Sequence, residues 1–423
     1  MYCGSCMRDN ALAAELMGQG HEVILLPLYT PTRTDARNVS GGRVFFGGIS
    51  VYLQQQSRLF GMLPKALDWL WDRPSVIRMF AGHGVDVDPG SLGALTVSIL
   101  EGRDGRQRKE LDNLIEWLRH DPPPDVIALP YTLLISLAKP MREATGRPVV
   151  CSLQGEELFL EGLTGEWRAR AIDLIRRQVQ HVDAFIATSR ASADHMSRYL
   201  AIPRDKIHVV SLGIDLRGFA PGGRAQGAVG FLGRIAPEKG LHVLADAYKI
   251  LRDKTGPMRL EAAGWMGGQN RAYLEGIQAK FRAWGIPDEF RYRGEVTRED
   301  KIRFLQTLDV FSMPATYDEP KGLPLLEAMA CGVPVVQPRR GSFPEMLEST
   351  GGGLLIEPDS AEALAAGLHA ILTDPGLARR LGRAGHDAVH GRFGIAQMAR
   401  DTVAVYEHAR QNSPDQHLAG RTA

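Results

Sequence analysis

Two glutamates, Glu319 and Glu327, stand eight positions apart in the stretch DEPKGLPLLEAMACGVPVV. Glu319 falls in a loop bounded by Pro and Gly, and Glu327 falls near the end of the first turn of the apolar helix that follows. Pro324 suits the first helical position, because its missing N–H would have no partner there, and Gly332 stops the helix before a Val-Pro-Val-Val strand. The N–H groups of a helix start attract phosphate, and carboxylates accept hydrogen bonds from sugar hydroxyls. The pattern therefore favours a ligand that is both a polyol and a phosphate, such as a nucleotide sugar.

An arbitrary pair of glutamates beside a loop is more often a solvated rim than a site. Here the residues between them are mostly Pro, Gly and Leu, and the helix continues as Ala-Met-Ala-Cys, which indicates a largely buried helix. A buried Glu327 should need a partner for its charge. The context therefore favours a binding role for the pair.

A second group, Arg234 and Lys239, lies in the stretch FLGRIAPEKGL. A strand ends there, Gly233 opens a loop, and a helix starts after Gly240, so both cations should lie at the carboxyl edge of a parallel sheet, where open α/β domains bind ligands. Arg can grip a phosphate with two hydrogen bonds, and Lys supplies a compact charge. Such a pair is usually solvated, but its coincidence with the two glutamates favours a diphosphate site.

The elements that must position these residues repeat a pattern of short apolar run, Gly-rich turn and helix, which indicates an α/β fold with parallel sheets. The predicted strands of the first half are 22–28, 125–129, 148–153, 184–188 and 208–212. Those of the second half are 228–232, 258–263, 290–293, 310–313, 333–337 and 353–356. We expect Thr297 with Asp300 to cap one helix, and Asp359 with Glu362 to cap another.

A chain of 423 residues is long for one core and suits two domains. We predict an N-terminal domain at 1–213 with an extra segment at 45–86, a linker at 214–227, a C-terminal domain at 228–390 and a final helix at 391–410. Lys and Arg number 50 against 49 acidic residues, so no net field favours nucleic acid or an anionic membrane. The longest apolar run, 126–138, is too short to span a bilayer, and we expect a cytoplasmic protein.

The stretch around the glutamates resembles the E-x7-E signature of the retaining glycosyltransferases of family 4. The similarity includes both Glu residues, the Gly between them and the continuation Glu-Ala-Met-Ala-x-Gly-x-Pro-Val-Val, and residues 233–240 match the family's G-R-x-x-x-x-K-G pattern. It covers most of the C-terminal domain and only patches of the N-terminal one. The resemblance implies the GT-B fold, with two facing Rossmann-like domains and a C-terminal helix that crosses back to the N-terminal domain.

The resemblance also assigns roles to residues. Catalysis would fall to Glu319, Arg234 and Lys239, with Glu319 contacting hydroxyls of the donor sugar and the two cations clamping the diphosphate. Glu327 would contact the ribose of the nucleotide. Backbone groups at three neighbouring residues would line the sugar and phosphate: Lys321, Gly322 and Leu323.

Three more residues are donor-binding candidates. By resemblance the turn at 294–296 lies under the nucleotide base, with the backbone of Val296 bonding it, although an ordinary strand-to-helix turn is the alternative. Gly4 could bring the backbone near the donor phosphates and sugar. Gln154 stands where related enzymes often carry His, and it keeps hydrogen-bonding capacity but cannot exchange a proton near neutrality. We keep Gln154 as a sugar contact, and its presence counts against a mechanism that needs an ionisable group there.

The N-terminal region departs from the family pattern. Its Gly-His-Glu-Val at 20–23 should follow a helix, a Gly-rich loop and a first strand, and the loop falls at 3–5. We therefore expect the first strand to precede Met1, with about ten residues lacking, or else a genuine degenerate N-terminus. Segment 45–86 mixes aromatic and basic residues, which fits a surface for a lipid-linked or polymeric acceptor or, more commonly, extra helices packed on the domain.

The motifs and the resemblance together predict a transferase that moves a hexosyl unit from a UDP- or GDP-sugar to a glycan, lipid-linked or small-molecule acceptor, as carbohydrate or cell-envelope biosynthesis requires. Retention at the anomeric carbon is what the resemblance implies. We expect no metal and no cofactor besides the nucleotide sugar, because the C-x-x-C at Cys3 and Cys6 has no second ligand pair. No nucleic acid partner and at most peripheral membrane contact are expected. Two alternatives stay open: a nucleotide-sugar 2-epimerase of the same architecture, and a non-catalytic nucleotide-sugar-binding protein.

Overall fold

The computed structural model describes residues 4–28, 34, 37–41, 89–120, 122–223 and 227–412. It divides into two compact units. The C-terminal unit comprises Met1–Ala11, Ser189–Ala191 and Ser211–Met398, and the N-terminal unit comprises Leu12–Thr188, Ser192–Val210 and Ala399–Ala423. The predicted extra segment at 45–86 lies outside the described residues.

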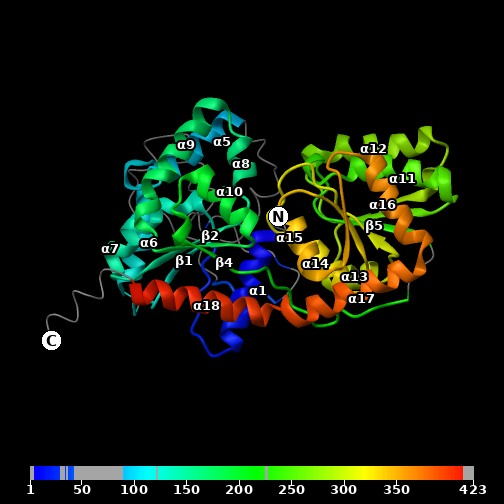
Figure 1. Ribbon diagram of the computed structural model, residues 1–423. Coiled ribbons are helices and arrows are strands. Elements are labelled where there is room, and N and C mark those ends of the chain that lie inside the picture. The colour runs from blue at the N-terminus through cyan, green and yellow to red at the C-terminus, as the bar shows by residue number, and fades with distance from the viewer. Residues whose placement is uncertain are drawn as a thin grey trace. The chain divides into compact units, whose positions relative to one another are not determined.

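The N-terminal unit contains a parallel sheet in the order β1-β2-β3-β4. Its strands confirm four predicted positions within a few residues: β1 (Ile127–Leu129), β2 (Val149–Leu153), β3 (Ala184–Ala187) and β4 (Ile207–Val209). The accompanying helices are α5 (Pro89–Leu100), α6 (Arg108–His120), α7 (Ala138–Thr145), α8 (Glu157–Glu161), α9 (Gly165–Gln178) and α10 (Arg190–Leu200). Figure 1 shows α5, α8 and α9 packed together beside this sheet. All four residues of β3 are buried, as expected for a central parallel strand.

The predicted strand at 22–28 is wrong. After helix α1 (Gly4–Gly18), residues 21–27 carry no strand, although the Gly41 N–H donates to the Leu25 carbonyl at 2.8 Å. Ile24 is 60% exposed, whereas Leu26 and Leu28 are partly buried and pack against the core of the N-terminal unit. A short apolar run becomes a strand only where a neighbouring strand accepts its backbone hydrogen bonds, and none of the described strands pairs with it.

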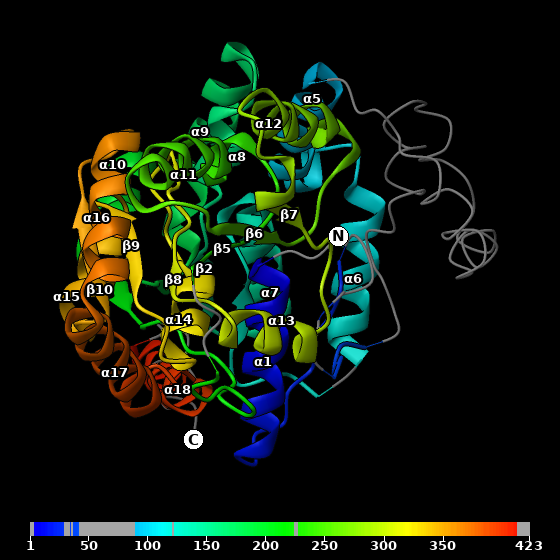
Figure 2. The same cartoon turned by 90° about the vertical axis from the view of Figure 1, so that its right-hand side faces the viewer.

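The C-terminal unit contains a six-stranded parallel sheet in the order β10-β9-β8-β5-β6-β7. All six predicted strands of the second half are confirmed: β5 (Ala228–Leu232), β6 (Arg259–Ala263), β7 (Phe290–Tyr292), β8 (Val310–Phe311), β9 (Val335–Pro338) and β10 (Gly353–Ile356). The helices are α11 (Leu241–Thr255), α12 (Arg271–Ala283), α13 (Arg298–Gln306), α14 (Leu323–Ala330), α15 (Phe343–Thr350), α16 (Ala361–Thr373) and α17 (Pro375–Arg392). Figures 1 and 2 show α11, α12 and α16 over one face of the sheet and α13, α14 and α17 over the other. The last helix, α18 (Ile395–Asn412), begins in the C-terminal unit, and its residues from Ala399 onward belong to the N-terminal unit.

The chain reverses its direction of winding between β5 and β8. Strands β6 and β7 extend the sheet on one side of β5, whereas β8, β9 and β10 extend it on the other. The loops after β5 and β8 therefore diverge to opposite faces, and such a switch point is where open α/β sheets bind ligands. The loop after β5 nevertheless packs closely against the loop after β8. A Cβ atom at Gly240 (φ 78°) would lie 1.8 Å from the Pro314 carbonyl oxygen, which leaves no room for a side chain. Only glycine fits there.

Of the two predicted helix caps, one is confirmed and one is wrong. The Asp300 N–H donates to Thr297 Oγ1 at 3.1 Å at the start of α13. At α16 the cap is Ser360, whose hydroxyl accepts from the Ala363 N–H at 3.0 Å. Asp359 has φ 57° and bonds Arg340 instead, at 2.5 and 3.0 Å. The left-handed turn places this residue outside the helix start, so its neighbour takes the capping position.

Within the part of the chain that the structure describes, no helix is both long enough and apolar enough to cross a bilayer.

Candidate active site

Glu319 lies in the loop between β8 and α14, and the packing of that loop fixes its position. The Glu319 carbonyl accepts hydrogen bonds from the Ser342 backbone N–H at 2.9 Å and the Ser342 hydroxyl at 2.8 Å. A Cβ atom at Gly341 would lie 2.5 Å from the Glu319 backbone nitrogen, so the start of α15 sits directly against the loop. The residue is 3% exposed. The protein therefore holds this carboxylate in place without help from a ligand.

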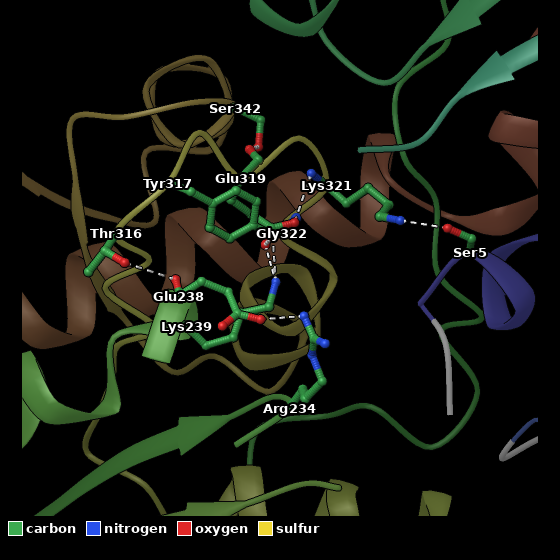
Figure 3. A network of polar contacts seen from close by, with 10 residues as sticks. All are labelled: Ser5, Arg234, Glu238, Lys239, Thr316, Tyr317, Glu319, Lys321, Gly322 and Ser342. Carbon is green, nitrogen blue, oxygen red and sulfur yellow. Dashed lines mark hydrogen bonds and ion pairs between the residues drawn. The ribbon is translucent and has the colours of Figure 1, made fainter. Parts of the chain in front are cut away.

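Lys239 approaches the same carboxylate from the loop after β5. Its Nζ forms an ion pair with Glu319 and lies 2.7 Å from the Tyr317 hydroxyl and 4.9 Å from the centre of the Tyr317 ring. The Tyr317 hydroxyl also donates to Glu319. Figure 3 shows these three side chains converging. Because Lys239 follows β5 and Glu319 follows β8, the cluster stands at the switch point of the sheet.

The ionisation of Glu319 follows from its surroundings. Burial alone would raise the pKa of this carboxyl group, but the charge and hydrogen bond of Lys239 outweigh burial. With help from the Tyr317 hydroxyl and the charge of Lys321, they lower the pKa of Glu319 to about 2. Near neutral pH, Glu319 is therefore an ionised hydrogen-bond acceptor and not a proton donor.

The start of α14 surrounds the other oxygen of Glu319. The backbone N–H groups of Lys321 and Gly322 lie 3.2 and 3.5 Å from Glu319 Oε1, and Lys321 Nζ donates to Ser5 Oγ at 2.8 Å. Gly322 has φ 70° and is followed by Leu323 as the first helical residue, so Pro324 occupies the second position instead of the predicted first. The C-terminal unit thus gathers these predicted residues around one carboxylate.

Gly4 joins this group through Leu323. A Cβ atom at Gly4 would lie 3.9 Å from Leu323 Cδ1, within ordinary van der Waals contact. The start of α1 is therefore adjacent to the start of α14, as the Ser5–Lys321 hydrogen bond also requires.

Arg234 lies in the same loop as Lys239, after β5, and is paired with a carboxylate other than Glu319. It is ion-paired with Glu238, and its side chain is 40% exposed. The carbonyl of Glu238 accepts from the Thr316 N–H at 3.0 Å, which ties the loop after β5 to the loop after β8. Figure 3 shows the Glu238 carboxylate joined to Arg234. Both predicted cations thus follow β5, each facing a carboxylate.

Glu327 is buried in α14, as expected, and the predicted partner for its charge is present. Lys301 Nζ, from α13, donates to Glu327 Oε1 at 2.6 Å. The two side chains are only 7% and 10% exposed, respectively. This pair is separate from the Lys239–Glu319 pair and joins a different helix to α14.

Within the C-terminal unit, the structure does not bring Val296 into the Glu319 cluster. Val296 lies in the turn after β7, two strands along from β5, and lines an open polar groove that also includes Arg293 and Phe304. Gln154 belongs to the N-terminal unit, where its side-chain nitrogen donates to the Pro130 carbonyl at 2.9 Å. The donor-binding roles of both residues stay predictions.

Four residues at or near the site were missed by sequence reasoning. Tyr317 stands two positions before Glu319, and its proximity was a usable signal. Ser342, Lys301 and Ser5 lie far from their partners in the sequence, and only the tertiary fold brings them there. Among the described residues, no three His, Cys, Asp or Glu side chains gather as a metal site would require. Independence from metal stays a prediction.

Comparison with known sequences identifies both units. The family model "Glycosyl transferase 4-like domain" matches residues 8–213, and the model "Glycosyl transferases group 1" matches residues 225–388. The D-inositol 3-phosphate glycosyltransferase of Streptomyces avermitilis is 33% identical over 268 residues, covering 59% of this chain and 57% of that protein. The enzyme of the same name from Segniliparus rotundus is 31% identical over 243 residues, covering 55% and 53%. The chain spans little more than half the length of these curated relatives.

Solved structures share the fold at low sequence identity. HepE from Anabaena, in complex with UDP, has a TM-score of 0.63 at 17% identity and covers 91% of this chain and 100% of its own. Sucrose-phosphate synthase from Thermosynechococcus elongatus has a TM-score of 0.61 at 20% identity, covering 71% and 78%. With two units, each built on a parallel sheet, and family matches over both, the chain belongs to the group 1 glycosyltransferases and has their α/β GT-B fold.

Proposed function

We propose that this protein transfers a hexosyl unit from a nucleoside diphosphate sugar to an acceptor, with retention at the anomeric carbon. The observation that carries the proposal is the Lys239–Glu319 pair at the switch point of the C-terminal sheet. It sets a cation suited to a diphosphate directly beside a carboxylate suited to sugar hydroxyls.

The two cations after β5 would stabilise the leaving group. Lys239 and Arg234 each face a carboxylate, so an entering diphosphate would compete with Glu319 and Glu238 for them. As the bond between the sugar and the diphosphate breaks, negative charge grows on the departing oxygen. Cations that meet this charge favour the transition state over the bound donor, which raises the rate of the chemical step.

Glu319 would orient the donor sugar. While paired with Lys239 it is ionised, with a pKa of about 2. When Lys239 turns to the diphosphate, the Tyr317 hydroxyl and the charge of Lys321 would still favour the ionised form, which accepts hydrogen bonds from sugar hydroxyls. For retention we propose displacement on one face of the sugar. The acceptor oxygen bonds to the anomeric carbon on the face that the diphosphate leaves, and the acceptor proton passes to the departing phosphate oxygen.

Names of related proteins suggest which substrates to try first. The Anabaena structures contain UDP and UDP-glucose, and the curated relatives are named for transfer to an inositol phosphate. We therefore propose a UDP-sugar donor ahead of a GDP-sugar, and a polyol phosphate as the first acceptor class to test beside glycans and lipid-linked sugars. The cytoplasmic location stays a prediction.

The proposal is tested first by binding. Thermal-shift measurements against UDP, GDP and their hexose derivatives should show stabilisation by one base class, and no stabilisation by any of them would refute a donor site. Product analysis with donor plus acceptor should then show transfer with retained configuration. Release of free, epimerised sugar from donor alone would instead indicate the 2-epimerase alternative, and binding without turnover would indicate a non-catalytic protein. Added chelator should leave turnover unchanged.

A further inference from the structure

The ion pair between Lys301 and Glu327 lies in a nearly dry environment. Lys301 Nζ and Glu327 Oε1 are 2.6 Å apart, with 7% and 10% of the two side chains exposed. On α14 the flanking residues Leu326 and Ala328 are fully buried, and on α13 Leu305 is fully buried. Two full charges have therefore been taken out of water between two otherwise apolar helix faces.

Stability alone does not explain such a pair. The cost of removing two charges from water often equals or exceeds their attraction, so apolar residues of similar size would hold two helices together as well or better. What a lysine adds is control over the carboxylate. A short charge-assisted bond to one oxygen fixes the rotation of the Glu327 carboxyl group and keeps it in the acceptor form.

The two helices begin where a bound nucleotide would lie. Helix α13 starts at Arg298, directly after the turn that contains Val296, and α14 starts at Leu323, directly after the loop that holds Glu319. Both turns follow the carboxyl ends of strands of the same parallel sheet. The Lys301–Glu327 pair thus links the turn proposed for the base with the loop proposed for the sugar, and the ribose is the part of the ligand between these two.

We propose that Lys301 is a positioning residue. It holds Glu327 ionised and turned to accept hydrogen bonds from the ribose hydroxyls, and it thereby sets a preference for ribonucleotide over deoxyribonucleotide donors. This inference rests on the proposed function, a nucleoside diphosphate sugar bound at this sheet edge, and on the ribose contact that the family resemblance implies for Glu327. It adds a residue on a different helix and a selectivity that the donor site as described above does not contain.

The test uses titration calorimetry to measure how strongly the protein prefers ribonucleotides to deoxyribonucleotides. UDP and GDP are compared with their 2′-deoxy and 3′-deoxy counterparts, and the base that binds more tightly is used. We expect the wild-type protein to bind the ribonucleotide about tenfold or more tightly than at least one deoxy form, because hydrogen bonds to charged groups are the stronger class. Glu327→Gln should reduce this ratio to about threefold or less, and Lys301→Gln should reduce it equally.

A double-mutant cycle separates positioning from a general loss of structure. If Lys301 acts through Glu327, the variant Lys301→Gln/Glu327→Gln should have the same ratio as Glu327→Gln alone, since no carboxylate remains to be positioned. The matched control is Lys254→Gln, which removes an exposed lysine from the last turn of α11 and should keep the wild-type ratio. A purely structural lysine would lower the melting temperature in Lys301→Gln but leave the ratio unchanged.

Lys301→Gln leaves Glu327 buried without its cation and could fail to fold. In that event Lys301→Arg takes its place, because it keeps the charge while its longer, planar group shifts the carboxylate. It should fold and show a reduced ratio, and an unchanged ratio would overturn the role of Lys301.

The outcomes also distinguish this inference from the proposed function. A ratio that falls in Glu327→Gln but not in the Lys301 variants overturns the positioning role alone. A wild-type ratio near one, or one that Glu327→Gln leaves intact, overturns the ribose contact of Glu327 and the inference with it. Failure to bind any of these diphosphates refutes the proposed donor site itself.

Discussion

Each unit buries a carboxylate at the carboxyl end of its parallel sheet, and the two carboxylates have different partners. In the N-terminal unit, Glu156 follows β2 and accepts hydrogen bonds from the Thr132 N–H at 3.0 Å, the Thr132 hydroxyl at 2.8 Å and the Gln154 N–H at 2.7 Å. In the C-terminal unit, Glu319 follows β8 and meets the ammonium group of Lys239 and the hydroxyl of Tyr317. The two residues are similarly buried, at 6% and 3% exposed.

The difference in partners predicts a difference in use. The donors on Glu156 belong to the neighbouring loops, two of them to the backbone, so it fixes the ends of β1 and β2 relative to each other. Lys239 is a long side chain that can turn toward a ligand while Glu319 stays in place. A buried carboxylate held by backbone groups is therefore a structural clamp, whereas one that shares a flexible cation can exchange partners with a substrate.

Replacing Glu319 should have the largest effect on chemistry. Glu319→Ala removes the acceptor for sugar hydroxyls and should lower kcat/KM by about 10²–10³-fold, the loss typical of one preorganised polar contact to the transition state. Steady-state transfer assays check this, with circular dichroism to confirm folding. Transfer at the wild-type rate in this variant would contradict the assignment of the site.

The free energy of unfolding should depend on pH through the same carboxylate, Glu319. The pKa of Glu319 in the folded protein, about 2, lies below the ordinary value of 4.5. Its contribution to stability is therefore fully present above about pH 4.5 and is lost as the pH falls toward 2, by on the order of 3 kcal/mol. Urea unfolding at a series of pH values should show a shallower loss in Glu319→Gln than in the wild type. Parallel curves would show that Lys239 does not stabilise the ionised form.

Replacing Glu156 should lower stability but leave nucleotide binding nearly unchanged. Glu156→Ala leaves buried donors on Thr132 and Gln154 without an acceptor and should lower the free energy of unfolding by about 1–3 kcal/mol. Because Glu156 acts as a clamp in the N-terminal unit, the dissociation constant for the nucleotide should stay within about twofold of the wild type, well under the tenfold that 1.4 kcal/mol would cause. Urea denaturation and calorimetry measure the two quantities. A variant that keeps its stability but loses nucleotide binding would show that Glu156 serves the ligand and is not a structural clamp.

The parts of this site that the sequence predicted are those that local patterns determine. Strands β5, which is fully buried, and β10, which is half-buried, occupy the predicted residues, because a short apolar run bounded by turns needs little else to specify it. The glutamate spacing likewise placed Glu319 in a loop and Glu327 on a buried helix. The same reasoning failed at 22–28, where an apolar run lacks a neighbouring strand, and at Asp359, where a left-handed turn moved the cap by one residue.

The contacts that make the site depend on the order of strands in the sheet. Lys239 and Glu319 are 80 positions apart, and they meet because β8 pairs with β5. Ser342, which precedes α15, and Lys301, in α13, likewise reach their partners only through the packing of elements around the sheet. Hydrophobic periodicity specifies each element but not its neighbours, so the ion pairs could not be derived from it. The resemblance to a family supplied roles for residues, and the partners of those residues came only from the fold.

The smallest expected effect concerns Tyr317, whose hydroxyl bridges the two charged groups. Tyr317→Phe keeps the ring under Lys239, 4.9 Å from its Nζ, and removes the hydrogen bond to Glu319. If Lys239 leaves Glu319 to bind the diphosphate, the hydroxyl is the contact that still holds the carboxylate. Its loss should then lower kcat by about five- to tenfold, the equivalent of one hydrogen bond of about 1 kcal/mol, with little change in KM. An effect on KM alone would mean that Tyr317 serves donor binding while Lys239 and Glu319 stay paired during transfer. Glu156 and Glu319 would then differ less in use than their partners indicate.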